Sequence, residues 1–257
     1  MYRNLKVVFM LLFVLNFFVF AQGTKDLYLT EDDISIVAST SWVGGIVEAA
    51  TNQKVQVLAP VELRHPPEYD FSPNDIIKAS KADLVFWAGY EGFIKNLVKA
   101  ANLDENNLHL VNTNNSPDKL VVSVKNVAEI LNTQKEFELW KNELDKLSSK
   151  LSENRDKRKS IKAVVQYHHK DFAQFLGYDV LFVFGPQDLT LGDIIKIEGL
   201  DADLIIDNWH SVQGESFKSG NRDYVQLINF PGPFNTSSIL DVISYNAKVL
   251  GLLDNHW

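Results

Sequence analysis

The chain contains no cysteine, and its two methionines, Met1 and Met10, both lie in the first ten residues. The absence of cysteine excludes disulfide bonds, thiolate zinc sites, thiol nucleophiles and a lipid-anchored N-terminal cysteine. A copper(I) site built on methionine is excluded as well, because both methionines belong to the apolar N-terminal segment. Any metal site in this chain must therefore use imidazole, carboxylate or amide donors.

Positive charge is also scarce, because 25 lysines and arginines face 33 acidic residues and leave a net charge of -8. Nucleic acid is not expected as a partner, since phosphate binding needs a basic face. The sequence contains neither GxSxG nor HExxH, and Gly44-Gly45 fits no dinucleotide or phosphate loop. Hydrophobic residues make up 46% of the 257 residues, which is enough for one large domain or two small ones.

Two basic residues precede an apolar run at residues 7–20, and the small residue Ala21 follows the run. This order predicts a signal peptide that is cleaved after Ala21. A membrane anchor is the alternative, but a spanning helix needs ~20 apolar residues and this run is shorter and contains an asparagine. We expect residues 1–21 to be the signal peptide and residues 22–33 a flexible lead-in. The mature chain is then secreted or periplasmic and is not a lipoprotein.

From residue 34 onward, short β-branched and apolar segments alternate with segments of helical periodicity. This alternation predicts an α/β fold with parallel sheets covered by helices. We expect two lobes, each with a four-stranded parallel sheet, and repetition between them that is architectural rather than a close sequence repeat. The expected strands are residues 34–40, 55–60, 83–89 and 108–113 in the first lobe, and 161–169, 178–186, 201–208 and 223–233 in the second.

A charged segment with apolar residues at helical intervals separates the two sets of strands. It predicts two consecutive helices that break near Asn132-Thr133, with a capping box between Thr133 and Glu136. We expect lobes at residues 34–119 and 160–257, a linking helical segment at 120–159, and a ligand cleft between the lobes. Other helices are expected at 41–51, at 73–82 with Ser72 as cap, at 90–101, 170–177, 189–200 and 237–253, with a weaker helical pattern at 209–220.

Four histidines lie at or just after the ends of predicted strands: His65, His168, His169 and His210. Ligands of open parallel sheets bind outside the carboxyl ends of the strands. If the two sheets face each other, these loops meet in one cleft. Neutral imidazole is a common ligand of first-row divalent metals, and three imidazoles suit zinc.

The candidate metal ligands are His65, His169 and His210, with His168, Glu68 and Asp207 as lesser candidates and Gln187 as a further oxygen donor. Only one of the adjacent pair His168 and His169 should reach the cleft, because neighbours on a strand point to opposite faces. Asp207 has a second interpretation, as the acceptor for the N–H of a ligating histidine. Glu68 has a second interpretation as a solvated side chain.

The segments at residues 36–51 and 55–101, together with VVQYHHKDFAQFLG at 164–177, resemble the substrate-binding proteins of metal-ion ABC transporters. The resemblance covers most of residues 34–253 and is strongest at 55–101. It implies a two-lobed, monomeric and non-enzymatic receptor that binds one divalent metal, zinc or else manganese or another transition metal. It also implies a membrane permease and a cytoplasmic ATPase as partners.

The resemblance can be carried over to individual residues. It places His65 two positions before the usual site of the first histidine, where this chain has Pro67. It favours His169 over His168, because the ligand histidine precedes a phenylalanine, here Phe172, by three positions.

Two further ligand positions of these receptors fall near Phe184-Gly185 and Asn229, which are poor ligands, so His210 would compensate. Because protons compete with the metal for imidazole, the affinity should fall as the pH drops through ~6.5.

Two alternatives remain open from the sequence. The first is a metal-dependent hydrolase with a three-histidine site, an open water position and Glu68 or Asp207 as the general base. The second is a receptor of the same fold for a non-metal ligand, with an aromatic pocket. The aromatic residues available for such a pocket are Tyr69, Phe71, Trp87, Trp209 and Phe234.

Overall fold

The computed structural model describes residues 34–61, 63, 68–218 and 221–254. The predicted signal peptide, the lead-in and His65 lie outside the described residues. Contacts divide the chain into residues 1–33 and a compact unit at 34–257, and only the second unit is described here. In the described part, no helix has both the length and the apolar character needed to cross a bilayer.

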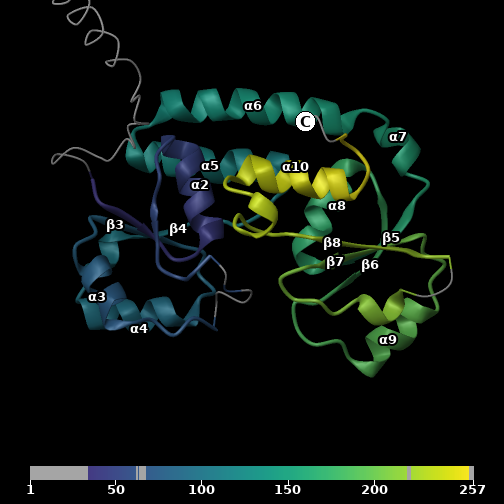
Figure 1. Ribbon diagram of the computed structural model, residues 1–257, viewed down its shortest axis with the longest axis horizontal. Helices are drawn as coiled ribbons and strands as arrows, with labels where there is room; N and C mark the ends of the chain where they lie inside the picture. The colour runs from purple at the N-terminus through teal and green to yellow at the C-terminus, as the bar shows by residue number, and fades with distance from the viewer. Residues whose placement is uncertain (1–33, 62, 64–67, 219–220, 255–257) are drawn as a thin grey trace, which may run out of the picture. The chain divides into compact units, whose positions relative to one another are not determined.

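The first sheet is parallel, with the strand order β2-β1-β3-β4 (Figure 1). Its central strands are rich in β-branched and aromatic residues, and Val37, Ala38, Val85 and Phe86 are buried. Its strands are β1 (Ile36–Ala38), β2 (Gln56–Val57), β3 (Leu84–Trp87) and β4 (Leu108–Leu110). Its helices are α2 (Ser41–Thr51), α3 (Pro73–Ser80) and α4 (Gly92–Ala101).

The second sheet is also parallel and has the equivalent order, β6-β5-β7-β8. The predicted fold class, with two four-stranded parallel sheets flanked by helices, is therefore confirmed. The strands are β5 (Lys162–Gln166), β6 (Asp179–Phe184), β7 (Leu204–Asn208) and β8 (Asp223–Leu227). The helices are α8 (Lys170–Leu176), α9 (Leu191–Glu198) and α10 (Ile239–Val249).

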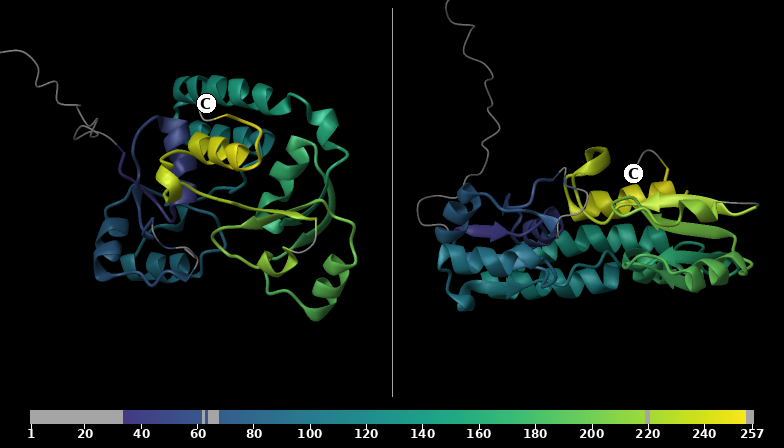
Figure 2. Two further views of the ribbon diagram at one scale, coloured as in Figure 1. Left: turned by 45° about the vertical axis from the view of Figure 1, so that its right-hand side comes forward. Right: turned by 90° about the horizontal axis from the view of Figure 1, so that it is seen from below.

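The linking segment consists of α5 (Pro117–Leu131), α6 (Gln134–Ser152) and the short α7 (Arg155–Arg158). Helices α5 and α6 lie side by side (Figures 1 and 2). The predicted break is confirmed, because Asn132 adopts a left-handed conformation and ends α5. The predicted capping box at Thr133 is wrong, since its hydroxyl has no hydrogen-bond partner among the described residues. The predicted lobe boundaries at 119 and 159 stay a prediction.

Arg158 closes the linking segment. Its buried guanidinium donates to the carbonyl oxygen of Leu176 at 2.6 Å, to that of Glu153 at 2.9 Å, and to that of Leu151. These acceptors belong to the last turn of α8 and to the C-terminal end of α6. One side chain therefore satisfies carbonyl groups that the helix ends leave without partners inside their own helices.

The two halves share sequence as well as topology. SPNDIIK at residues 72–78 and TLGDIIK at 190–196 both form capping boxes, at the starts of α3 and α9. Each helix is followed by Ala-Asp-Leu, and the aspartate binds the backbone N–H just before or at the start of the first strand of its sheet. Asp83 accepts from Ser35 at 2.7 Å, and Asp203 accepts from Lys162 at 2.8 Å. These matches are short and local, so the expectation of a repetition that is architectural rather than a close sequence repeat stays a prediction.

One apolar cluster extends through both halves. It joins Trp42 and Ile46 of α2 to Leu144 of α6 and to Ile239 of α10. Gly45 allows α2 and α10 to approach closely, because a Cβ atom at this position would lie 2.9 Å from Cγ1 of Ile239 and 3.2 Å from Cγ of Pro231. The halves are thus joined through a packed interior and not only through the linking segment.

We expect Gly45→Val to lower the free energy of unfolding by about 1–3 kcal/mol, because overpacking a close contact forces neighbouring groups to move. Urea denaturation followed by circular dichroism measures this change. Gly92→Ala is the matched control at the start of α4, where a Cβ atom would meet nothing within 4 Å. Equal stabilities of the two variants would contradict the packing role of Gly45.

Candidate functional site

Trp42 is the point where loops from both sheets meet. Its indole N–H donates to Oδ1 of Asn115 at 3.0 Å, and Nδ2 of Asn115 donates to the carbonyl of Asn229 at 2.6 Å. The ring centroid of Trp42 lies 5.9 Å from that of His168 and 6.3 Å from that of Phe230. Loops that follow β1, β4, β5 and β8 therefore converge, as expected for the carboxyl ends of parallel strands.

His169 lies directly after β5, on a 3-10 turn at Tyr167–His169. Its side chain is fully buried, and neither ring nitrogen makes a well-aligned hydrogen bond among the described residues, although polar groups of Asn208 and Leu227 lie close enough to interact with it. Burial lowers its pKa to about 3, and the charge on His168 contributes in the same direction. Nearby polar groups of Asn208 and Leu227 oppose this shift. The imidazole is therefore neutral near pH 7, which is the form that binds metals.

His210 follows β7, as predicted, and its side chain is buried. Its Nδ1 accepts the backbone N–H of Asn229 at 3.2 Å, so the ring proton lies on Nε2 when the ring is neutral. The ring packs against Phe230 with centroids 3.6 Å apart. Coordination through Nε2 would need the other tautomer, at the cost of the bond to Asn229. The role of His210 as a ligand stays a prediction.

Asp207 organises the loop that follows β7. Its buried carboxylate accepts N–H groups of Asn208 at 2.8 Å, Gln213 at 3.2 Å and Gly214 at 2.7 Å, and the hydroxyl of Tyr224 at 2.8 Å. The weak helical pattern at 209–220 is wrong within the described residues, because the only helical turn there is the 3-10 turn Glu215–Phe217. The backbone N–H groups bind a carboxylate instead of continuing a helix.

Asp207→Asn should lower the free energy of unfolding by roughly 2–3 kcal/mol, because the amide loses charge-assisted bonds and directs an NH2 group at donors. Thermal and urea denaturation measure the change. Asp223→Asn is the matched control, since Asp223 is exposed at the start of β8 in the same sheet. A variant as stable as wild type would show that the carboxylate does not hold the loop.

Glu91 is a buried acid that the sequence reasoning did not identify. Its carboxylate accepts the hydroxyl of Ser39 at 2.6 Å and the N–H of Ala88 at 3.0 Å. These partners follow β1 and β3, so Glu91 ties together the carboxyl ends of two central strands. The signal available in the sequence was an acidic residue within four positions of a buried strand.

The remaining predicted positions do not gather around one point in the described part. Glu68 and Gln187 are exposed, and Phe184 packs against Phe217 with centroids 6.3 Å apart. Within the residues that the structure describes, no three histidine or acidic side chains form a group able to hold a metal ion. Because His65 lies outside this part, the predicted set His65, His169 and His210 stays a prediction.

Asn229 supplies a second buried atom without a hydrogen-bond partner in the described part, its side-chain Oδ1. It stands just beyond β8, while His169 stands just beyond β5. Buried polar atoms are normally satisfied, so such atoms at the carboxyl edge of a parallel sheet are candidate ligand contacts. Both candidate donors are neutral.

We expect the imidazole of His169 to stay neutral between pH 8 and about pH 4, as its pKa of about 3 requires. Because an unfolded histidine takes up its proton near pH 6.5, the stability due to neutral His169 is present above ~6.5 and is lost as the pH falls toward 3. NMR of 15N-labelled histidine measures the titration directly. In urea denaturation, His169→Leu should lose less stability than wild type between pH 7 and pH 4. A His169 titration near pH 6.5 would contradict this expectation.

No protein-family model matches the chain. A stretch of 112 residues is 30% identical to a metal ABC transporter substrate-binding lipoprotein of Lactococcus lactis subsp. lactis (strain IL1403). The match covers 41% of this chain and 36% of that protein, so the chain spans little more than a third of this relative's length.

Solved structures match over almost the whole described part. The AdcAII protein of Streptococcus pneumoniae has a TM-score of 0.68 at 16% identity, over 86% of this chain and 98% of that chain. A Zn(II)-bound mutant variant of AdcAII has a TM-score of 0.62 at 16% identity, over 85% and 98%. A Mn-bound periplasmic metal binding protein from candidatus liberibacter asiaticus has a TM-score of 0.63 at 14% identity, over 86% and 100%. The predicted resemblance is thus confirmed at the level of the fold.

Proposed function

We propose that this chain is a substrate-binding protein of a metal-ion ABC transporter, and that it binds a divalent metal ion outside the cytoplasm. The observation that carries the proposal is the fully buried, neutral imidazole of His169, whose nitrogens make no well-aligned hydrogen bond in the described part of the chain. It lies at the carboxyl end of β5, in a fold shared with a Zn(II)-bound and a Mn-bound protein.

The metal ion is the cargo of this receptor. His169 supplies a lone pair that needs no deprotonation near pH 7, and Oδ1 of Asn229 supplies a neutral oxygen from the end of β8. His65 would add an imidazole from the other half. Imidazole donors favour zinc, because manganese prefers more carboxylates. The loaded receptor delivers the ion to a membrane permease that a cytoplasmic ATPase drives.

The pH dependence follows from the same residue. Because His169 is already neutral at pH 5, protons do not compete for it in the range where an ordinary histidine titrates. A loss of affinity near pH 6.5 must therefore come from other imidazoles of the site. The sequence alone predicted that metal affinity falls as the pH drops through ~6.5, because the ligating imidazoles become protonated. In the structure, this expectation applies to the other imidazoles of the site but not to His169.

The receptor function is favoured over a metal-dependent hydrolase. A hydrolase needs a general base with a free lone pair close to the bound water. The carboxylate of Asp207, one of the two bases considered, already accepts four groups. The other base, Glu68, is exposed.

A receptor of the same fold for a non-metal ligand is the second candidate. It is favoured by the absence, among the described residues, of any three-residue group able to hold a metal. It is also favoured by the aromatic rings of Trp42, Phe230 and His210 where the two halves meet. These rings would bind an apolar or aromatic ligand.

Calorimetry of the chelator-stripped mature protein should show one site for zinc and weaker binding of manganese. His169→Ala should reduce zinc affinity at least about tenfold, the usual scale for loss of a metal-site residue, and should abolish the rise in melting temperature with zinc. His109→Ala, on β4, is the matched control and should bind like wild type. Unchanged zinc binding in His169→Ala would overturn the proposed site, and no binding of any divalent metal would favour the second candidate.

Asn229→Asp gives an independent check of the same site. A buried carboxylate without a partner should destabilise the metal-free protein near pH 7, because an uncompensated charge is costly to bury. Zinc should restore the melting temperature and bind more tightly than to wild type. A variant that zinc does not stabilise would place Asn229 outside the site.

A further inference from the structure

A cavity of about 450 Å³ is lined by residues of α2, α6 and the start of α10. Its lining is mainly apolar, with Ala49, Leu139, Trp140 and Leu240 among the contributing residues. None of the residues from the loops around Trp42 lines it. The cavity is therefore a second concave surface, separate from the candidate metal site, and a small organic molecule fits its volume.

Helix α6 presents one face to this cavity. Glu136, Leu139, Trp140 and Glu143 all line it, and their spacing of i, i+3, i+4 and i+7 places them on one side of a helix. Leu139 is 58% exposed, which is unusual for a large apolar residue in the middle of a helix. The two carboxylates flank the apolar pair, and two helical turns separate them by about 10 Å along the axis.

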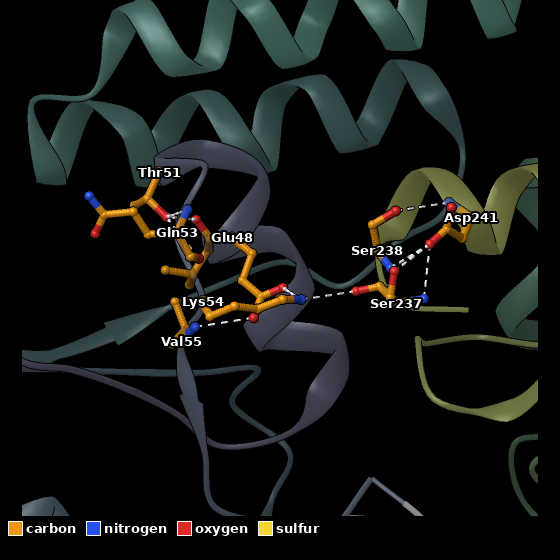
Figure 3. Close-up of polar contacts among 9 residues, drawn as sticks. Glu48, Thr51, Gln53, Lys54, Val55, Ser237, Ser238 and Asp241 are labelled. Atoms are coloured by element: carbon orange, nitrogen blue, oxygen red, sulfur yellow. Dashed lines mark hydrogen bonds and ion pairs between the residues drawn. The ribbon is translucent and has the colours of Figure 1, made fainter. Parts of the chain in front are cut away.

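The charged groups of the lining leave an excess of negative charge. On the α2 side, Glu48 binds the ammonium of Lys54 at 2.9 Å and the N–H of Val55 at 3.1 Å, while Lys54 also reaches the carbonyl of Ser237 at 3.5 Å (Figure 3). Lys54 is 79% exposed in this pair and offsets part of the negative charge, but it is the one ammonium against three carboxylates in the lining. The carboxylate of Glu48 already accepts hydrogen bonds from Lys54 and Val55. The carboxylates that a ligand can bind are therefore those of α6.

The two acids of α6 differ in their partners. Glu143 pairs with Lys146 at 2.8 Å, but both side chains are exposed, so the pair is weak. The carboxylate of Glu136 is half-buried and contacts no polar group elsewhere in the described part of the chain. Glu136 is therefore the strongest anionic contact that the cavity offers.

The helix ends around the cavity differ in charge, and the positive N-terminal end of α6 stabilises the carboxylate of Glu136 in its first turn. The C-terminal end of α2, with Asn52 in the lining, carries partial negative charge. The N-terminal end of α10 carries partial positive charge, but the carboxylate of Asp241 already binds the N–H groups of Ser237 and Ser238, each at 2.9 Å (Figure 3). An anion has no open position there, whereas a cation is favoured.

We propose that this cavity binds a linear alkyl polyamine. One terminal ammonium group binds Glu136, the other terminal group binds Glu143, and the methylene groups between them cover Leu139. The central secondary ammonium group lies against the indole of Trp140, because an aromatic face attracts a cation. The ligand class follows from the geometry, because two cationic ends about 10 Å apart, joined by an alkyl chain that carries a further cation beside the indole, match this face of α6. The site goes beyond the metal-binding function and does not depend on it.

Calorimetric titration of the mature protein with spermidine tests the proposal. We expect saturable binding of one molecule, and a loss of affinity of about tenfold or more in Glu136→Gln, the scale of losing one charged contact. Glu138→Gln removes the same charge from the exposed side of α6 and should bind like wild type. 1,3-Diaminopropane carries two ammonium groups but is too short to reach both carboxylates, so it should bind more weakly.

Three outcomes would overturn the proposal: no saturable binding of spermidine, equal losses in Glu136→Gln and Glu138→Gln, or equal affinities for spermidine and 1,3-diaminopropane. The second and third would show that spermidine only screens the negative charge of the protein. His169→Ala should leave spermidine binding unchanged, and Glu136→Gln should leave zinc binding unchanged. The proposal of a metal site and the proposal of a polyamine site can therefore be refuted independently of each other.

Discussion

The close approach of α2 and α10 is the constraint on which the rest of the structure depends. It requires a residue without a side chain at position 45, and it merges the apolar surfaces of the two halves into one core. Burial of apolar surface is the main favourable term in folding, so a shared core stabilises both sheets together. The same contact brings together the loops beyond the strand ends and forms one wall of the polyamine cavity.

Most of the fold could be predicted from the sequence, because β-branched runs and helical periodicity report burial directly. The starts of α3 and α9 were predictable for a second, local reason. A serine or threonine followed by an aspartate at the third helical position forms a capping box, which satisfies N–H groups at the start of a helix. Thr133 shows the limit of this rule, because the same pattern stands at the start of α6 without the hydrogen bond. The pattern at 209–220 failed because a buried carboxylate, Asp207, organises that loop.

The candidate site was harder to predict. The sequence shows which residues lie near the ends of strands, but it does not show which hydrogen bonds these residues already make inside the protein. Asp207 lies at the end of the expected strand and His210 follows it, yet the carboxylate of Asp207 and Nδ1 of His210 are bound to neighbouring groups. The full burial of His169 agrees with the preference for it over His168 that its spacing to Phe172 gave. Glu91 lies beyond β3 and Asp207 lies within β7, and the carboxylates of both hold the loops that follow these strands.

The buried guanidinium of Arg158 has a mechanical consequence. It hydrogen-bonds to the C-terminal end of α6 and to the last turn of α8, so these two helix ends keep a fixed spacing. Helix α8 begins at the residue after His169. A shift of the C-terminal end of α6 would therefore also move α8, which starts at the turn that holds the imidazole.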